Sequence, residues 1–429
     1  MKIRTLLLIL PALLLWACEP EIDQFEPSAG EADFSVFVSV GNSLTAGFAD
    51  GELYRYSQEN SFPNIMARQL GYVGNEIFRQ PLMKDDLGFG NRLVLGMAED
   101  CQGNESLGPV PAGGTPDPGN FESIAEDGPF HNLGVPGAKT SHLLAAGYGV
   151  LNPYYGRFAT NPSTSSVIGQ TMALDPSFFT LWIGNNDILG FAMGGGEGEP
   201  ITPPEDFQNY YGLLLSQLTA NGARGAVANI PDIASIPFFN TFPYNALVLT
   251  SQPLIDMLNE AYNELDHISF SFGPNGFVVS DPGAPGGMRQ LVAGEKLLLS
   301  LPMDKIRCEG WGSQAPIPAE YYLSLGQLSQ IEDAVESYNA IIAQYAKDLD
   351  LALADANTIL KNAKSGIYFD GLEFNTAFVT GGVFSLDGVH LSPRGNAIVA
   401  NLFLEAINEQ YNASIPLVSV TKFDGIIFP

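Results

Sequence analysis

The chain has 429 residues, 45% of them hydrophobic, so it can build one large folded core or two ordinary ones. Its 47 acidic residues outnumber its 19 basic residues, and the formal charge is −28. Because a surface of this sign repels phosphate backbones and anionic headgroups, the composition argues against nucleic acid as a partner.

The N-terminal residues have the pattern of an export signal, predicted over residues 1–18. Lys2 and Arg4 precede an apolar run that is too short to cross a bilayer as a helix. Cys18 follows a small residue at the end of this run, which resembles a bacterial lipobox, in which the cysteine is acylated and becomes the mature N-terminus. The alternative is an ordinary secretory signal with a chance cysteine. The lipobox interpretation predicts a protein anchored by lipid at Cys18, in the outer membrane, at the cell surface or in the periplasm.

Residues 19–33 are acidic and carry few apolar side chains, which predicts a solvated tether between the lipid and the folded domain. With Cys18 assigned to the signal, Cys101 and Cys308 remain as an even pair in an exported chain. A disulfide between them and two separate thiols are both open, because nothing in the sequence places the two cysteines near each other.

The rest of the chain alternates between predicted strands and predicted helices. In chain order these are a strand at 34–40, a helix at 62–70, a strand within 130–138, a helix at 139–146, a strand at 177–183, a helix at 207–218, a strand at 225–230, a helix at 328–349, a strand at 351–356 and a helix from 392 to about 411. Such alternation indicates βαβ units and a parallel sheet with helices on both faces.

Two long stretches interrupt this alternation. Residues 84–129 are rich in Gly, Pro, Asn and acidic residues, which predicts a long surface excursion without a core of its own. Residues 238–322 contain frequent Pro and Gly, and only 253–266 have the spacing of a helix. We interpret the second stretch as an insertion over or beside the sheet.

Ser43 stands where the first predicted strand ends abruptly at Gly41. A parallel strand that ends in this way directs its last residues into the crevice where ligands of open α/β sheets bind, so Ser43 is the candidate nucleophile. A serine hydroxyl needs a base within hydrogen-bond reach and a third group that orients the base. Of the four histidines, His390 has a carboxylate three residues upstream, Asp387, and precedes a capped helix. An Asp-x-x-His pair by itself is more often a turn or a cap.

Acyl transfer also requires donors directed at the developing oxyanion. Two predicted strand ends supply candidates, the backbone N–H of Gly137 and the side-chain amide of Asn186. Each residue also has a purely structural explanation. Gly137 can serve only to allow a positive φ, and Asn186 can serve only to form the turn after its strand.

Four short blocks, taken together, resemble the SGNH (GDSL-type) hydrolase family over about residues 36–410. The blocks are Gly41–Leu44, Asn132–Gly137, Gly184–Asp187 and Asp387–His390, in that order. No Gly-x-Ser-x-Gly motif of the α/β-hydrolases is present. The resemblance implies a flavodoxin-like, three-layer α/β/α domain at 34–429, with a central, mostly parallel five-stranded sheet and no metal or cofactor. It also implies site roles: Ser43 as nucleophile, His390 as base, Asp387 as its orienting acid, and the Ser43 N–H, Gly137 N–H and Asn186 amide as oxyanion hole.

One residue departs from the family pattern: Asn42 stands where the family usually has Asp, although Asn can still cap the turn. The two long stretches exceed a minimal family domain and are expected to shape the substrate site.

The predicted function is a membrane-tethered, exported serine esterase that works through an acyl-enzyme. Lipid or acyl esters and acetylated glycans are both open as substrates. Two alternatives remain, a binding module with weak or lost hydrolysis and a transferase that uses the same residues.

Overall fold

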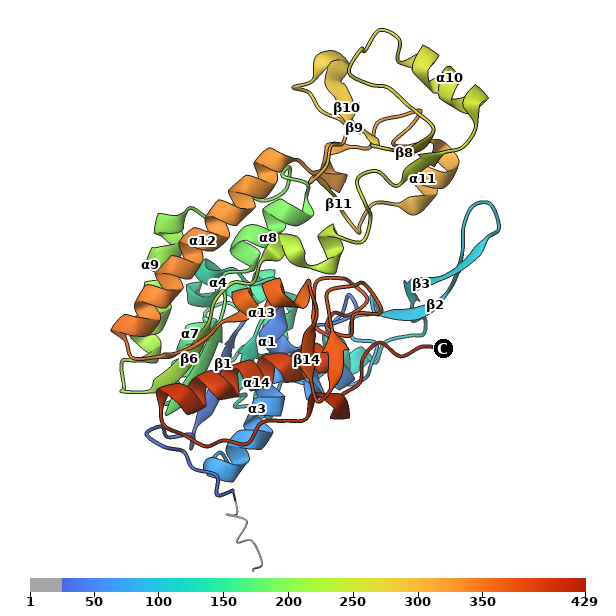
Figure 1. The fold of residues 1–429 in the computed structure, drawn as a ribbon. Helices are drawn as coiled ribbons and strands as arrows, with labels where there is room; N and C mark the ends of the chain where they lie inside the picture. Colours follow the sequence, from blue (N-terminus) through green and yellow to red (C-terminus); the bar gives the residue numbers. More distant parts are fainter. Residues whose placement is uncertain (1–24) are drawn as a thin grey trace, which may run out of the picture.

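The centre of the molecule is a five-stranded sheet in which all strands are parallel, as the computed structural model of residues 25–429 shows (Figure 1). The strand order is β13-β6-β5-β1-β4. The strands are β1 Phe37–Gly41, β4 Asn132–Gly134, β5 Phe178–Trp182, β6 Arg224–Ala228 and β13 Ala352–Ala354. All five predicted strands are therefore confirmed. Every residue of β1 and β5 is buried, which explains why these strands have continuous apolar runs.

Helices cover both faces of the sheet and complete the three layers. On one face lie α3 Phe62–Leu70 and α14 Pro393–Gln410, where the rings of Phe62 and Phe403 stack at 5.1 Å. On the other face lie α4 Thr140–Leu144, α7 Val167–Met172, α9 Pro204–Leu218 and α12 Leu325–Asp348. Phe207 of α9 stacks on Tyr338 of α12 at 4.0 Å. The predicted α/β/α architecture is confirmed.

Local capping signals account for where the two longest helices begin. Ser392 caps α14, with its Oγ accepting from the Gly395 N–H at 3.1 Å and Pro393 in the first turn. Ser324 and Gln327 form a capping box at the start of α12. The remaining helices are α1 Ser43–Ala46, α2 Arg55–Glu59, α5 Tyr148–Leu151, α6 Pro153–Phe158, α8 Asn186–Met193, α10 Gln252–Ala261, α11 Met303–Glu309 and α13 Ala356–Ala363.

The first long stretch, residues 84–129, contains a regular element that the sequence did not reveal. Strands β2 Leu93–Glu99 and β3 Glu105–Pro111 form an antiparallel hairpin. Gly108, Pro109 and Pro111 within β3 hide the alternation that would signal a strand, because both residue types are depleted in strands. Most residues of the two strands are exposed or half-buried, so the hairpin is a surface element whose strands were not predicted from the sequence.

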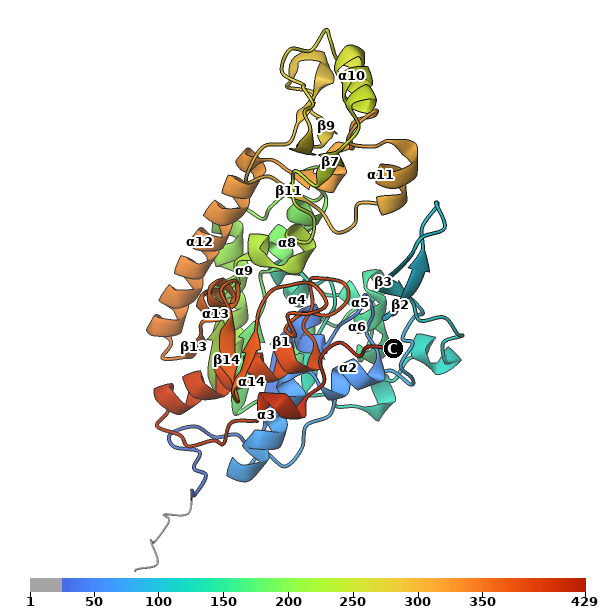
Figure 2. The same cartoon turned by 45° about the vertical axis from the view of Figure 1, so that its right-hand side comes forward.

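The second long stretch, residues 238–322, projects beyond the carboxyl end of the sheet (Figure 2). It contains α10, α11 and short paired strands: β7 Leu247–Leu249 with β8 Gly273–Asn275, β9 Val278–Ser280 with β10 Met288–Gln290, and β11 Lys296–Leu297 with β12 Tyr322–Leu323. Two small apolar clusters stabilise it, one around Leu258 and Phe270 and one around Val279 and Ile317. The predicted helix at 253–266 ends earlier, at Ala261. We refer to residues 238–322 as the insertion.

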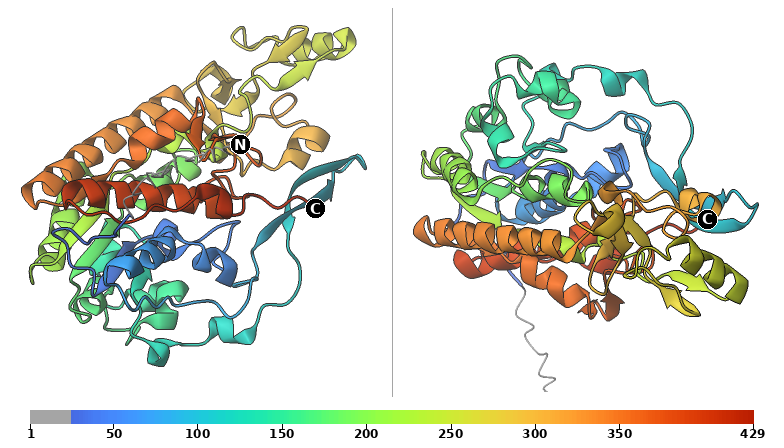
Figure 3. Two further views of the ribbon diagram at one scale, coloured as in Figure 1. Left: turned by 60° about the horizontal axis from the view of Figure 1, so that its bottom comes forward. Right: turned by 90° about the horizontal axis from the view of Figure 1, so that it is seen from above.

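A disulfide links the hairpin to the insertion. Cys101, in the turn between β2 and β3, is bonded to Cys308 of α11, with Cα atoms 6.5 Å apart. Arg307 forms an ion pair with Asp100 next to the bond, at 3.0 Å. Seen from above, the tip of the hairpin lies beside the insertion (Figure 3, right). Of the two possibilities that the sequence left open, the structure contains the disulfide.

The predicted export signal, Cys18 and the first part of the tether lie outside the described residues. The rest of the predicted tether contacts the domain: Ser28 bridges to Ser414, and the Glu31 N–H donates to the Tyr411 carbonyl at 2.8 Å. Ala32 is buried. This end of the predicted tether therefore lies against the domain, with Ser28 and Glu31 still exposed. Within residues 25–429, no helix is both long and apolar enough to cross a membrane.

The last strands are β14 Ile367–Phe369 and β15 Leu372–Phe374, which form a hairpin between α13 and α14. The chain after this hairpin returns across the carboxyl end of the sheet before it enters α14 (Figure 1). This return segment contains Asp387 and His390, so the sheet topology places them at the end of the sheet where β1 terminates.

Candidate active site

Ser43 lies in the first turn of α1, directly after the central strand β1. The turn requires Gly41, because a Cβ there would lie 2.2 Å from Thr45 Oγ1 and 2.4 Å from the Trp182 carbonyl oxygen. Asn42 caps α1, with its Oδ1 accepting from the Leu44 N–H at 3.0 Å. The departure from the family pattern at Asn42 therefore preserves the capped turn that holds the serine.

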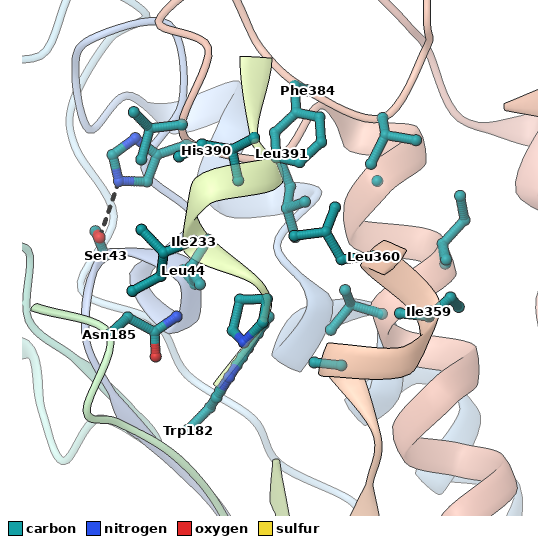
Figure 4. A pocket seen from close by; sticks show the side chains of 18 of the residues that line it. Ser43, Leu44, Trp182, Asn185, Ile233, Ile359, Leu360, Phe384, His390 and Leu391 are labelled. Atoms are coloured by element: carbon teal, nitrogen blue, oxygen red, sulfur yellow. Dashed lines mark hydrogen bonds between the residues drawn. The ribbon is translucent and has the colours of Figure 1, made fainter. Parts of the chain in front are cut away.

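His390 connects the serine to a carboxylate. Its Nε2 lies 2.9 Å from Ser43 Oγ (Figure 4). Its Nδ1 lies 2.9 Å from Asp387 Oδ2. With Nδ1–H donating to the carboxylate, Nε2 is left to accept the serine hydroxyl. The ring also packs against Phe48, with centroids 4.7 Å apart. This arrangement allows the imidazole to remove the hydroxyl proton as Ser43 attacks an electrophile.

Asp387 is partly buried, with 14% of its side chain exposed, and accepts five hydrogen bonds. Oδ2 accepts from His390 Nδ1 and from the Gly51 N–H at 3.0 Å. Oδ1 accepts from Ser385 Oγ at 3.1 Å and from the backbone N–H groups of Val389 and His390 at 2.9 and 2.8 Å. Burial alone would raise the pKa of Asp387, but the charge and hydrogen bonds of His390 and the Val389 N–H hold this pKa well below its usual range. The carboxylate is therefore ionised at neutral pH.

A second loop, which contains Asp50, holds this carboxylate in place through Ser385. This contact was not identified from the sequence. The Asp50 N–H donates to Ser385 Oγ at 3.0 Å, and Asp50 Oδ1 accepts from the Leu386 N–H at 2.9 Å. Tyr54 donates to Asp50 Oδ2 at 2.6 Å. Burial raises the pKa of Asp50, although the Tyr54 and Leu386 hydrogen bonds oppose the rise. Because Asp50 and Ser385 are far apart in the chain and belong to no recognisable motif, no sequence signal could have identified the pair.

The predicted oxyanion donors differ in their hydrogen bonds. Gly137 is exposed, has φ +78°, and a Cβ there would meet nothing within 4 Å. Within residues 25–429, neither the Ser43 N–H nor the Gly137 N–H donates to a backbone acceptor. Asn186 Nδ2 donates to the Ala138 carbonyl at 2.9 Å, which joins Asn186 to the turn that carries Gly137. One amide hydrogen of Asn186 remains for another acceptor.

A pocket begins at Ser43, His390 and Asn186 and continues between apolar side chains. It contains about 810 Å³ of atom-free space, its open mouth included. Figure 4 shows its apolar wall, formed by Leu44, Ile233, Ile359, Leu360, Phe384 and Leu391. None of its described lining residues comes from 84–129 or 238–322, so the expectation that these stretches shape the site is wrong for the pocket wall. The insertion does support the site from outside, because the Phe238 N–H donates to the Gly388 carbonyl at 2.9 Å.

The other three histidines lie elsewhere. His131 is buried behind β4 and accepts from the Arg79 N–H at 3.2 Å, His142 lies in α4, and His267 is exposed in the insertion. No group of three or more His, Cys, Asp or Glu residues among the described residues is arranged to hold a metal ion. The structure therefore brings Ser43, His390 and Asp387 together and leaves the remaining histidines apart from them.

The family described as GDSL-like Lipase/Acylhydrolase matches residues 37–403, which is most of the chain. The chain belongs to this family. It is an ester-hydrolysing serine hydrolase. As a GDSL-like hydrolase it carries the Gly-Asn-Ser-Leu block in place of the motif that names the family. No curated protein matches its sequence significantly.

Solved structures similar to this GDSL-like hydrolase include a putative GDSL-like lipase from Parabacteroides merdae, at 11% identity and a TM-score of 0.35, covering 89% of this chain and 99% of that one. A lipase/acylhydrolase from Enterococcus faecalis has 10% identity and a TM-score of 0.34, with coverage of 89% and 98%. A putative lipolytic protein of the G-D-S-L family from Desulfitobacterium hafniense has 10% identity and a TM-score of 0.34, with coverage of 87% and 99%.

Proposed function

We propose that this chain is an exported, lipid-anchored serine esterase in which Ser43, His390 and Asp387 act as a catalytic triad on esters of aliphatic acids. The observation that supports the triad most directly is the pair of 2.9 Å hydrogen bonds that His390 makes, one to Ser43 Oγ and one to Asp387 Oδ2. A base that is oriented in this way and faces a serine at a strand end is the arrangement that acyl transfer requires.

In the proposed mechanism, His390 Nε2 takes the Ser43 proton as Oγ attacks the ester carbonyl. Asp387 stays ionised and stabilises the imidazolium that forms. The Ser43 N–H, the Gly137 N–H and the remaining Asn186 amide hydrogen stabilise the oxyanion. His390 then gives its proton to the leaving alcohol. Water, activated by the same imidazole, attacks the acyl-enzyme and releases the acid.

The apolar pocket favours aliphatic acyl esters over acetylated glycans. Its wall next to Ser43 consists of Leu44 and Ile233, and it continues to Leu360 without a charged side chain among its described residues. Each methylene buried against such a wall contributes about 0.8 kcal/mol, whereas an acetyl group would leave the far end of the pocket unfilled. We therefore expect kcat/KM to rise with acyl-chain length until the chain reaches the far wall.

The proposed anchor is supported by the sequence pattern at Cys18. In a Gram-negative host grown with radiolabelled palmitate, the full chain should take up label and sediment with the membrane fraction. Cys18→Ser should lose the label and move to the soluble fraction. A soluble, unlabelled wild-type chain would instead favour an ordinary secretory signal, and esterase activity would be unaffected by that outcome.

The proposed triad is tested by treating the full chain, purified in detergent, with a fluorophosphonate probe and with aryl esters of two to eight acyl carbons. We expect labelling and turnover by the wild type, and loss of both in Ser43→Ala. His390→Ala should lower kcat by roughly 10⁴-fold or more. His267→Ala, an exposed histidine in the insertion, is the matched control and should keep full activity. A folded wild-type chain without labelling or turnover would support the binding-module alternative.

A further inference from the structure

Three asparagines line the pocket, and one of them lacks the partners that the other two have. Asn42 Oδ1 accepts from the Leu44 N–H, and Asn186 Nδ2 donates to the Ala138 carbonyl. Asn185 Oδ1 is buried without a hydrogen-bond partner among the described residues. No hydrogen bond joins the Asn185 amide to another side chain drawn in Figure 4 either.

The position of Asn185 is rigid. It follows β5 directly and precedes α8, and its backbone carbonyl accepts from the N–H groups of Ile188 and Leu189 at 3.2 and 2.9 Å. Gly184 before it has φ +113°, and a Cβ there would lie 2.8 Å from both Ile230 and Phe207. The backbone therefore cannot easily rotate to give the amide another partner. Only 7% of the residue is exposed, so water does not compensate fully.

The amide lies at the catalytic end of the pocket. Figure 4 shows the Asn185 side chain next to Ser43 and Leu44, with Ile359 and Leu360 at the opposite end. An aliphatic chain bound along this wall would cover the amide Nδ2 and leave it unpaired, which costs free energy. A substrate group that hydrogen-bonds the amide would recover that cost. Because of where the amide lies, this group belongs on the first carbons of the acyl chain.

We infer that Asn185 selects acyl esters that carry a hydroxyl group on carbon 2 or carbon 3 of the acyl chain. Asn185 Oδ1 is closed to solvent, so it is Nδ2, without a partner among the described residues, that donates to the hydroxyl oxygen. The rest of such a chain is aliphatic and fits the apolar wall beyond. This inference rests on the proposed function, because it assumes that the pocket holds the acyl group. Asn185 contacts the substrate and takes no part in the proton transfers.

The test compares kcat/KM for aryl esters of hexanoate, 2-hydroxyhexanoate and 3-hydroxyhexanoate, using the full chain in detergent. For at least one hydroxy ester, the ratio to hexanoate should be about tenfold higher in the wild type than in Asn185→Leu. Comparing ratios between two forms of the enzyme cancels differences in the intrinsic reactivity of the esters. Asn185→Ala replaces Asn185→Leu if the latter fails to fold, as judged by circular dichroism.

Leu360→Ala is the matched control, because it shortens a side chain of the same pocket wall at the far end. It should lower turnover of the hydroxylated and plain esters by the same factor and keep their ratio. If both hydroxy-to-plain ratios are the same in the wild type and in the Asn185 variant, the inference is overturned.

A second measurement separates failure of this inference from failure of the proposed function. If the wild type turns over none of the esters, the proposed function fails. Binding then decides the inference, through the thermal shift that hexanoate and the two hydroxyhexanoates produce in Ser43→Ala. The inference is supported if, in Ser43→Ala, a hydroxyhexanoate produces a larger thermal shift than hexanoate and this difference is absent in Ser43→Ala/Asn185→Ala. Equal shifts in Ser43→Ala contradict it.

Discussion

The carboxyl end of the central sheet and the insertion differ in how they are stabilised. In the sheet, β1 and β5 are buried on both faces by helices from opposite sides. In the insertion, the strands are two or three residues long and pack around two small apolar clusters. The described pocket lining comes from the sheet and its adjoining segments, whereas the insertion contributes no described lining residue and contacts the site from outside, at Gly388. The groups proposed to react are thus held by the rigid part of the molecule.

The difference suggests how the two regions divide their roles. A substitution at the sheet end should change activity or global stability, while a comparable substitution in the insertion should change neither strongly. The four predictions below test this division, beginning with the largest expected effect.

Asp387→Asn should lower kcat by roughly 10³–10⁴-fold, because an amide in place of the carboxylate favours the wrong tautomer of His390. Steady-state kinetics with an aryl ester measures the loss. Asp281→Asn is the matched control in the insertion, since it removes a carboxylate that pairs with Arg289 at 2.6 Å. The control should change kcat less than twofold. A similar loss in both variants would contradict the division of roles.

Leu181→Ala removes a fully buried side chain from β5 and should lower the free energy of unfolding by about 2–5 kcal/mol. Leu258→Ala removes an equally buried side chain from α10, in one of the small clusters of the insertion. We expect it to loosen the insertion while fluorophosphonate labelling persists. Urea denaturation followed by tryptophan fluorescence, with labelling measured in parallel, separates the two outcomes. Loss of labelling in Leu258→Ala at low urea would show that the site depends on the insertion.

The pKa of Asp387 predicts how stability depends on pH. Because this pKa is held below its unfolded value of about 3.9, the carboxylate stabilises the fold above that pH, and this contribution is lost as the pH falls through the lower, folded-state pKa. The stability difference between wild type and Asp387→Asn should therefore shrink as acid is added below about pH 4. The pKa of Asp50 is raised by burial, so its contribution is lost as the pH rises.

Asp50→Asn is the control for this measurement, and its difference from the wild type should change with pH in the opposite direction. Chemical denaturation at several pH values measures both differences. If the two stability differences change with pH in the same direction, the assigned directions of the pKa shifts are contradicted.

Cys308→Ser should have the smallest effect. Opening the disulfide removes the covalent link between the hairpin and α11, but the Arg307–Asp100 ion pair remains and each element keeps its own backbone hydrogen bonds. We expect a loss of roughly 2 kcal/mol or less, at the low end of the usual range for disulfides, with kcat unchanged within twofold. Limited proteolysis should show faster cleavage at residues 100–104, and a large loss of activity would link the hairpin to the site.

Much of the sheet and the site could be predicted from the sequence. The five strands are apolar runs that end at Gly, Asn or Asp, and the cap at Ser392 and Pro393 marks the start of α14. Parallel strands end at one edge of a sheet, so residues 347 positions apart, Ser43 and His390, were expected to lie near each other. Such signals are local, because neighbouring residues alone determine periodicity and capping.

The tertiary structure alone decided the remaining features. The β2–β3 hairpin, the pairing of Cys101 with Cys308, the brace of Asp50 on Ser385 and the unpaired amide of Asn185 all depend on contacts between segments far apart in the chain. The pocket likewise combines α13 with the ends of β1 and β5. Which distant side chains meet depends on packing of the whole chain, and no spacing within a single segment encodes it.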